Sequence, residues 1–334
     1  MRRGRRRDTV VGMEVRETTG GAESGHDPDV VVGCRRGASW VRVTRGLHRR
    51  DGVADPRVAD LVAWQVLLPA EAAFSALTAA WLRGWDLPPL PDDLPVCAAM
   101  AYGVTAPVRP GQLRVTRHRV PPPHDVRRGV RVTTAAETLV TCAPLLSLLD
   151  LVVLVDSALR ARDIELLELL LICRQHRRGV GRLRRAVALA DAQTDSVMET
   201  LLRVLYVVCG LDVETQHTVH DADGRFVARG DVWLRGTRTL ADYDGAVHAD
   251  RRQQRVDRRR DRRIVDADWV GRAYTDDDLL RRPVTVLREA DAAVGRPHDP
   301  RRIRAWTTLF RESSWTAAGR SGLSRRHGVR RRAA

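Results

Sequence analysis

Residues Asp231 to Asp261 read DVWLRGTRTLADYDGAVHADRRQQRVDRRRD. A short apolar run carries Asp231, and after a glycine-containing turn a second run ends in Asp242-Tyr243-Asp244-Gly245. Two strands joined by a tight turn bring their acidic residues to one end of a sheet. Carboxylate oxygens suit Mg²⁺, and a metal ion held by them can activate water against a phosphodiester. The stretch therefore predicts an α/β fold with a metal site at the end of its sheet.

The segment after these acids is strongly basic and is predicted to be a helix over 249–266. Eight arginines stand against two aspartates between Arg251 and Arg263. This excess of positive charge favours contact with nucleic-acid phosphates. Ion pairing with Asp257 and Asp261, which lie at helical spacing from several arginines, remains an alternative. The candidate nucleic-acid-binding residues are Arg251, Arg252, Arg255, Arg259 and Arg260.

The composition points to a polyanionic partner. The chain has 334 residues, a net charge of +15 and a pI of about 11.0, which makes DNA the expected partner. All 57 basic residues are arginine, and the sequence contains no lysine. Enzymes that need a catalytic lysine are thereby excluded, including Walker-type NTPases, Schiff-base enzymes, protein kinases and nucleases with a strict PD-(D/E)xK signature.

Cysteine spacing and hydropathy bear on the compartment. The five cysteines are at least 31 residues apart and form no CxxC pair, which argues against a zinc knuckle and fits reduced thiols. The most apolar segment, 143–155, is interrupted by Asp150 and is too short to span a bilayer. We expect a cytoplasmic protein that does not enter a membrane, and the sequence leaves its oligomeric state open.

Composition and periodicity divide the chain into four parts. Residues 1–38 lack sustained periodicity and are predicted to be a disordered basic N-terminus. Residues 39–190 are predicted to form an α-rich α+β domain, and 191–295 an α/β domain with a mixed sheet flanked by helices. Residues 296–334 are predicted to be a basic C-terminal tail. Within the α/β domain a helix begins at Thr194-Asp195-Ser196, and the strands expected after it are 213–219, 225–234, 237–243 and 269–274.

The order helix, three strands, helix, strand, helix over 195–293 resembles the restriction-endonuclease-like fold. Its motifs resemble the very-short-patch-repair-like branch of the PD-(D/E)xK superfamily. That family has an acid on the first helix, an acid on the middle strand, Glu-x-Asp-Gly followed by His, an Arg-Asp-rich helix and a Gly-Trp-hydrophobic strand. This sequence departs from the pattern at Asp242, which replaces the family's Glu, and at Asp268, which replaces its Gly. The matching positions are Glu199, Asp231, Asp242-Tyr243-Asp244-Gly245, His248, Arg260-Asp261 and Trp269-Val270.

The resemblance implies a metal-dependent DNA endonuclease that uses Mg²⁺ or Mn²⁺. Asp231 and Asp244 would be the metal ligands, and Asp242 would complete the site or hold a water. His248 would take a proton from the attacking water, and Glu199 would act from the helix. The alternatives are structural: Glu199 can cap its helix, His248 can be a helix N-terminal residue, and the aspartates can be turn and strand-end acids.

A second resemblance lies nearer the N-terminus. Trp40 to Leu47 reads WVRVTRGL and resembles the last wing of the winged-helix domain of AbiEi-type antitoxins, and FSALTAAWL within Ala72 to Leu82 resembles the helix that follows it. In that family the wing follows a helix-turn-helix, but 1–38 offers no helix pair, so we expect a truncated remnant. This resemblance implies another function: a non-catalytic DNA-binding regulator or antitoxin with a toxin partner, which keeps the nuclease fold as a scaffold. A third possibility is a protein–protein interaction module whose basic ends bind nucleic acid non-specifically.

Overall fold

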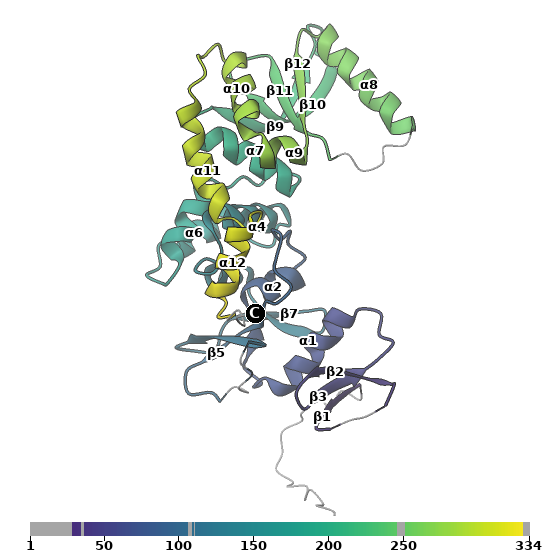
Figure 1. The fold of residues 1–334 in the computed structure, drawn as a ribbon, viewed down its shortest axis with the longest axis vertical. Helices are drawn as coiled ribbons and strands as arrows, with labels where there is room; N and C mark the ends of the chain where they lie inside the picture. Colours follow the sequence, from purple (N-terminus) through teal and green to yellow (C-terminus); the bar gives the residue numbers. More distant parts are fainter. Residues whose placement is uncertain (1–28, 35–36, 106–108, 110, 246–250, 330–334) are drawn as a thin grey trace, which may run out of the picture.

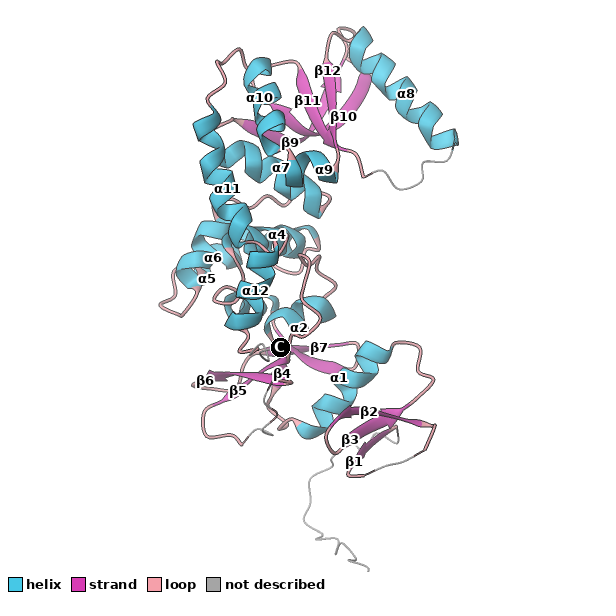
Figure 2. Ribbon diagram, in the orientation of Figure 1, coloured by secondary structure: helices cyan, strands magenta, loops and turns pink. Residues whose placement is uncertain are grey.

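The structure, a computed structural model, describes residues 29–34, 37–105, 109, 111–245 and 251–329, with the backbone alone for 251–258. Within these residues it is mixed α/β, with three sheets and helices packed between and around them. Two sheets of the N-terminal half lie at one end, the four-stranded sheet of the C-terminal half lies at the other, and a helical layer separates them (Figures 1 and 2). The mixed α/β class agrees with the prediction from the sequence.

The first sheet is antiparallel, with the order β1-β3-β2. A tight turn with Gly46 at a φ of 73° joins its second and third strands, in the segment predicted to be a wing. The first strand corrects the prediction that all of 1–38 is disordered, because Val30 to Val32 pair with Arg49 to Leu47. The elements are β1 (Val30–Val32), β2 (Trp40–Thr44), β3 (Leu47–Arg50) and the helix that packs on them, α1 (Pro56–Leu67).

The second sheet has five strands in the order β6-β5-β4-β8-β7. Strand β6 pairs in parallel with β5 and forms one edge of the sheet. The elements are β4 (Ala73–Phe74), α2 (Ala76–Leu82), β5 (Val96–Ala101), β6 (Leu113–His118), β7 (His124–Arg127) and β8 (Val130–Thr133).

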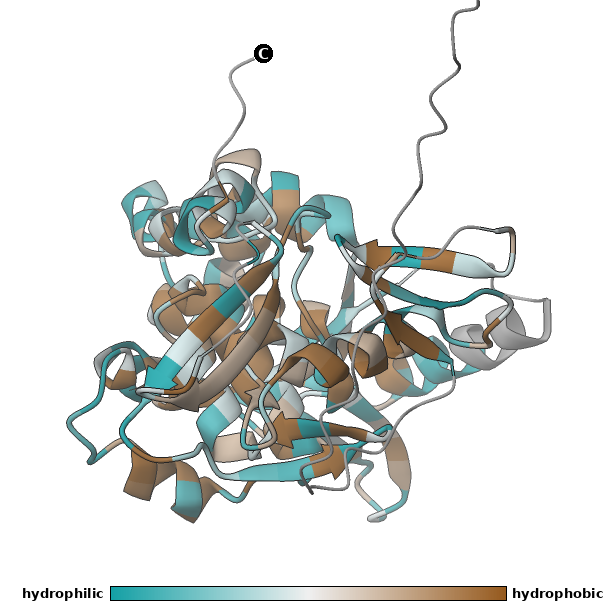
Figure 3. Ribbon diagram, turned by 90° about the horizontal axis from the view of Figure 1, so that it is seen from below, coloured by the Kyte–Doolittle hydropathy of each residue, from teal (hydrophilic) through white to brown (hydrophobic). Residues whose placement is uncertain are grey.

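A helical layer follows, and its centre is almost wholly apolar. In α4 (Leu148–Arg160), twelve of thirteen residues are buried, as expected of a helix that is surrounded on all sides. Seen along the long axis, apolar residues concentrate on the inner strands and helices, and the peripheral loops are hydrophilic (Figure 3). No helix in the described ranges is long and apolar enough to cross a membrane. The other helices are α3 (Ala135–Cys142), α5 (Leu166–Ile172) and α6 (Val180–Val187).

The C-terminal half contains the element order predicted from its sequence. Its sheet has the order β12-β11-β10-β9, antiparallel except for the parallel pair β11 and β12. Val232 joins the core that contains α7, and its neighbour Trp233 packs near Ile264 of α8, so the two helices cover opposite faces. The elements are α7 (Val197–Val208), β9 (Val213–His220), β10 (Phe226–Leu234), β11 (Thr239–Tyr243), α8 (Arg251–Asp266), β12 (Val270–Tyr274), α9 (Asp276–Arg281) and α10 (Pro283–Ala293).

The predicted tail over 296–334 is wrong for most of its length. A short 3₁₀ turn (Pro300–Arg302), α11 (Ile303–Glu312) and α12 (Ala317–Arg326) follow Gly295. Trp306 and Leu323 are buried in the same core as the apolar side chains of α4 and α7. At Gly319 an added Cβ would lie 1.7 Å from the carbonyl oxygen of Ser313, so only glycine allows α12 to start this close to the end of α11.

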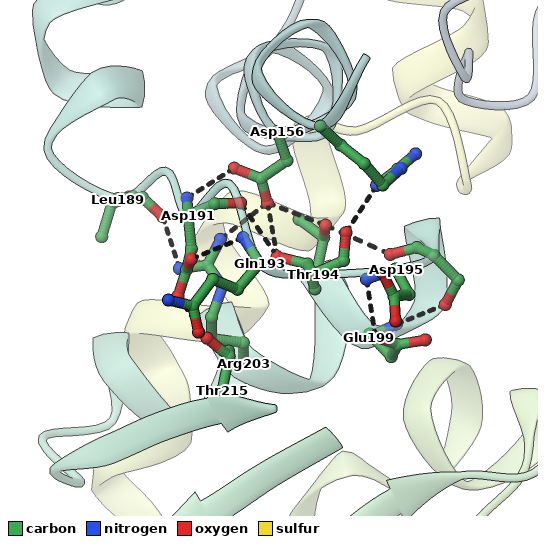
Figure 4. Close-up of polar contacts among 12 residues, drawn as sticks. Asp156, Leu189, Asp191, Gln193, Thr194, Asp195, Glu199, Arg203 and Thr215 are labelled. Carbon is green, nitrogen blue, oxygen red and sulfur yellow. Dashed lines mark hydrogen bonds and ion pairs between the residues drawn. The ribbon is translucent and has the colours of Figure 1, made fainter. Parts of the chain in front are cut away.

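A buried polar network crosses the boundary predicted at residue 190. The carboxylate of Asp156 on α4 is fully buried and accepts hydrogen bonds from the amide of Asp191, the hydroxyl of Thr200 and Nη2 of Arg203, each at 2.8 Å (Figure 4). Nη1 of Arg203 donates to the carbonyl of Leu189 at 2.6 Å. The helical layer and the C-terminal sheet therefore share one core and one polar network.

Candidate functional site

The candidate site is the point where strands β10 and β11 separate. Their backbone pairing runs to Val232 and Ala241, after which β10 continues along β9 and β11 along β12. At the next position side chains replace the ladder: the amide of Asp231 donates to Oδ1 of Asp242 at 2.9 Å, and the amide of Tyr243 donates to Oδ2 of Asp231 at 2.8 Å. We call this position, with its two facing aspartates, the strand fork.

A glycine lies beside Asp231 on β10. A Cβ added to Gly230 would lie 2.8 Å from Cδ2 of Leu240. That spacing is too short for carbon atoms in contact, so a larger residue would have to displace the side chain of Leu240. Gly230 thus leaves room for that buried leucine next to the fork.

The fork concentrates negative charge in a partly buried place. Burial, together with the charges of Glu199 and Asp242, raises the pKa of Asp231 to about 6. The hydrogen bond from the Tyr243 amide and the charge of Arg260 act in the opposite direction. An aspartate pKa is ordinarily about 4, so the fold holds this carboxylate where its ionised form is costly.

Arginine from α8 provides the positive charge nearest the fork. Nη2 of Arg260 donates to Oδ2 of Asp242 at 2.7 Å and to the carbonyl of Arg229 at 3.0 Å. Arg260, one of the five arginines predicted to contact nucleic acid, is therefore bound to Asp242. Arg259, another of the five, is exposed. Three further arginines predicted to contact nucleic acid lie on α8, but their side chains are outside the described part: Arg251, Arg252 and Arg255.

Glu199 has the capping role that was one of its two predicted roles, and it also lies close to the fork. Its amide donates to Oγ of Ser196, the N-cap of α7, at 3.2 Å. Its own Oε2 accepts from the amide of Asp195 at 2.8 Å and from Nε2 of Gln216 on β9 at 3.0 Å. These bonds fix a buried carboxylate whose charge acts on Asp231.

The remaining predicted residues lie beyond the end of β11. Asp244 is exposed, and its amide donates to the carbonyl of Tyr274 at 2.9 Å, which extends the pairing with β12 by one bond. The carboxylate that faces Asp231 is that of Asp242, the residue predicted to complete the site. His248 lies outside the described residues.

The carboxylate oxygens of the fork can be compared with the ligands that a divalent cation requires. Among the described residues, no group of three or more histidine, cysteine, aspartate or glutamate side chains is placed to hold a metal ion. Mg²⁺, however, commonly binds through one or two carboxylates and keeps several waters. Two carboxylates are compatible with such a hydrated ion, but three of the four oxygens of Asp231 and Asp242 already accept hydrogen bonds from the amides of Asp231 and Tyr243 and from Arg260.

Sequence reasoning missed two neighbours of this site. Gln216, which donates to Glu199, has a φ of 52° within β9, and no sequence signal marks a glutamine for that conformation. On the same strand His217 stacks on Trp233, with ring centroids 4.1 Å apart, and Trp269 lies 5.9 Å from His217. These two tryptophans pack against the ring of His217.

Comparisons with family models, with curated proteins and with solved structures find no match for this chain. The resemblances to very-short-patch-repair-like nucleases and to AbiEi-type antitoxins therefore remain predictions from the sequence motifs.

Proposed function

We propose that the C-terminal half is a metal-dependent endonuclease that hydrolyses phosphodiester bonds of DNA at the strand fork. The observation that carries this proposal is the pair of facing carboxylates, one of which has a pKa raised to about 6 by burial and by Glu199 and Asp242. A divalent cation there would offset the repulsion that the fold imposes on these acids.

Asp231 and Asp242 would hold the ion, with waters completing its shell. When bound, Mg²⁺ or Mn²⁺ would polarise the phosphoryl oxygen and lower the pKa of a bound water. Neutral pH is above the pKa of Asp231, so its carboxylate is mostly ionised there and is available as a ligand. Arg260 orients the carboxylate of Asp242, and the exposed Arg259 on the same helix offers a contact to the DNA backbone.

The arrangement of the sheet supports the same proposal. Three antiparallel strands, a parallel fourth strand and helices on opposite faces agree with the restriction-endonuclease-like order expected from the sequence. The fork lies between the two central strands and presents two carboxylates where the backbone pairing ends, and functional side chains commonly lie where strands end.

Plasmid nicking tests the proposal. Purified chain should nick supercoiled DNA in Mg²⁺ or Mn²⁺, and Asp231→Asn or Asp242→Asn should each lower the rate about a hundredfold or more. Asp223→Asn is the matched control, because that aspartate is exposed in the β9–β10 turn and pairs with Arg225. Asp244→Asn tests the ligand assignment made from sequence, with a smaller loss expected because Asp231 faces Asp242. Full activity in Asp231→Asn would overturn the proposal.

One observation favours a second function, DNA binding without catalysis. Nη2 of Arg260 lies 2.7 Å from Oδ2 of Asp242, so a protein cation already neutralises one of the two carboxylates. In a regulator or antitoxin this pair would simply stabilise the fork. Absence of nicking by the wild type with either metal, together with unchanged DNA affinity in Asp231→Asn and Asp242→Asn, would establish this second function over the first.

A further inference from the structure

A pocket of about 1080 Å³ lies in the N-terminal half, away from the strand fork. Its walls are strand β6, the loop from Arg119 to Pro123, helix α3 and the segment that joins α5 to α6. The fork belongs to the four-stranded sheet at the opposite end of the molecule (Figure 1). The pocket therefore needs an explanation of its own.

Two of the arginines that line the pocket are engaged within the protein. Arg177 makes a bidentate ion pair with the buried Glu137, with bonds of 2.6 and 2.7 Å. Nη1 of Arg117 donates to the carbonyls of Ala101 and Val104 at 3.0 and 2.7 Å. These contacts build the pocket wall and leave little capacity for a ligand.

Three further arginines are in excess. Arg114, Arg119 and Arg178 line the pocket, and within the described part of the chain no acidic side chain pairs with them. Besides Glu137, the other carboxylate of the lining is that of Glu168. The pocket thus presents three uncompensated guanidinium groups against one acid.

One buried nitrogen supports an anionic ligand. The Nε–H of Arg114 is shielded from solvent and has no hydrogen-bond partner among the described residues, and an unsatisfied buried donor is unfavourable. Nε2 of His118 is also without a partner there, while Nδ1 of the same ring lies 3.8 Å from Oε1 of Glu137. An anionic ligand in the pocket would supply the acceptor that the Arg114 Nε–H lacks.

The rest of the lining is apolar and includes an aromatic ring at the rim. Val115, Val140, Leu145 and Ile172 line the inner wall, and Tyr102 is 66% exposed. A suitable ligand therefore has an anionic end and a flat or apolar part. The volume is near the upper end of the range for sites that hold small molecules.

We propose that this pocket binds a nucleoside phosphomonoester, either a free nucleoside monophosphate or the 5′-phosphorylated end of a nucleic-acid strand. Guanidinium groups recognise phosphate through paired, charge-assisted hydrogen bonds. The apolar wall and Tyr102 accept the base, since aromatic rings stack on every nucleobase. The proposal stands independently of catalysis at the fork.

Binding to the full chain is measured by calorimetric titration in EDTA, so that loss of nuclease activity cannot affect the result. The probes are adenosine monophosphate, adenosine, inorganic phosphate, and one short oligonucleotide with and without a 5′-phosphate. Adenosine monophosphate should bind at least about tenfold more tightly than adenosine or phosphate alone. Tighter binding of the 5′-phosphorylated oligonucleotide than of both the mononucleotide and the oligonucleotide without a 5′-phosphate would identify a strand end as the source of the phosphate. Equal binding of the two oligonucleotides, with tight binding of the mononucleotide, would identify a free nucleotide.

Variants at the pocket mouth complete the test. Arg119→Ala and Arg178→Ala should each weaken binding of the best phosphorylated probe about tenfold. Arg174→Ala is the control, because this exposed arginine lies four residues before Arg178 and does not line the pocket. Thermal melting verifies that each variant folds. The proposal is overturned if no phosphorylated probe binds at millimolar concentration, or if Arg174→Ala weakens binding as much as Arg178→Ala does.

Discussion

At the scale of single residues, Asp231 carries the clearest consequence of the fork. Its folded pKa of about 6, raised mainly by burial, exceeds the value of about 4 expected in the unfolded chain. The folded state therefore binds more protons between pH 4 and 6, and stability falls as the pH rises through that window. Asn at this position has no charge and still accepts the Tyr243 amide. We expect Asp231→Asn to exceed the wild type in stability by roughly 1–2 kcal/mol at pH 7, allowing for solvent screening, and by nothing at pH 4.

Urea denaturation in EDTA at both pH values measures this difference. Asp223→Asn removes an exposed carboxylate from the turn before β10, and its effect on stability should stay within about 0.5 kcal/mol at either pH. If the difference in unfolding free energy between Asp231→Asn and the wild type did not change with pH, the pKa of Asp231 would not be raised in the folded state.

At the scale of elements, α4 is the helix on which the core depends. Leu154 is fully buried at its centre, whereas Leu167 on α5 is 69% exposed. Leu154→Ala should lower the free energy of unfolding by about 2–5 kcal/mol, because it leaves a cavity that its neighbours fill only partly. The same change at Leu167 should cost less than about 0.5 kcal/mol. Chemical denaturation of the two variants is the measurement, and equal losses would contradict the burial of α4.

An element could be predicted from the sequence where its own residues carry a local signal, such as alternation of apolar residues or a capping residue. Strands β9 to β12 and the capped start of α7 at Ser196 have clear alternation or a capping residue, and these were found. Helices α11 and α12 were missed because the arginine-rich composition after Gly295 was interpreted as a tail, although α11 packs Ile303, Trp306, Leu309 and Phe310 on the core. Which acid faces Asp231 depends on strand register, and the position of Arg260 depends on how α8 packs. Neither can be read from spacing along the chain.

At the scale of the whole molecule, the buried Asp156 network joins the helical layer to the C-terminal sheet. Asp156→Ala leaves the guanidinium of Arg203 buried without its carboxylate, which should cost about 3–5 kcal/mol. Asp195→Ala is a matched control, since the pair of Asp195 and Arg229 has a similar distance of 2.7 Å but is solvent-exposed; there the loss should be about 1 kcal/mol or less. Guanidinium chloride denaturation measures both losses, and the helical layer should unfold together with α7 in each variant, because α4 and α7 share one core cluster.

Helices α11 and α12 pack on the same core as α4 and α7, so removing both should cost more stability than either substitution above. Ser314, in the turn between α11 and α12, donates its amide to the buried carboxylate of Asp150 on α4 at 3.1 Å, and its hydroxyl lies 3.2 Å from the same carboxylate. Ending the chain at Gly295 would remove these donors together with Trp306, and would expose the apolar sides of α4 and α7 to water. We expect the shortened chain to bind a hydrophobic dye and to lose cooperative melting. Trp306→Ala in the full chain should cost about 3–5 kcal/mol, whereas Arg304→Ala, on the exposed side of α11, should have little effect. A shortened chain that melts like the full one would mean that 296–334 is a dispensable tail after all.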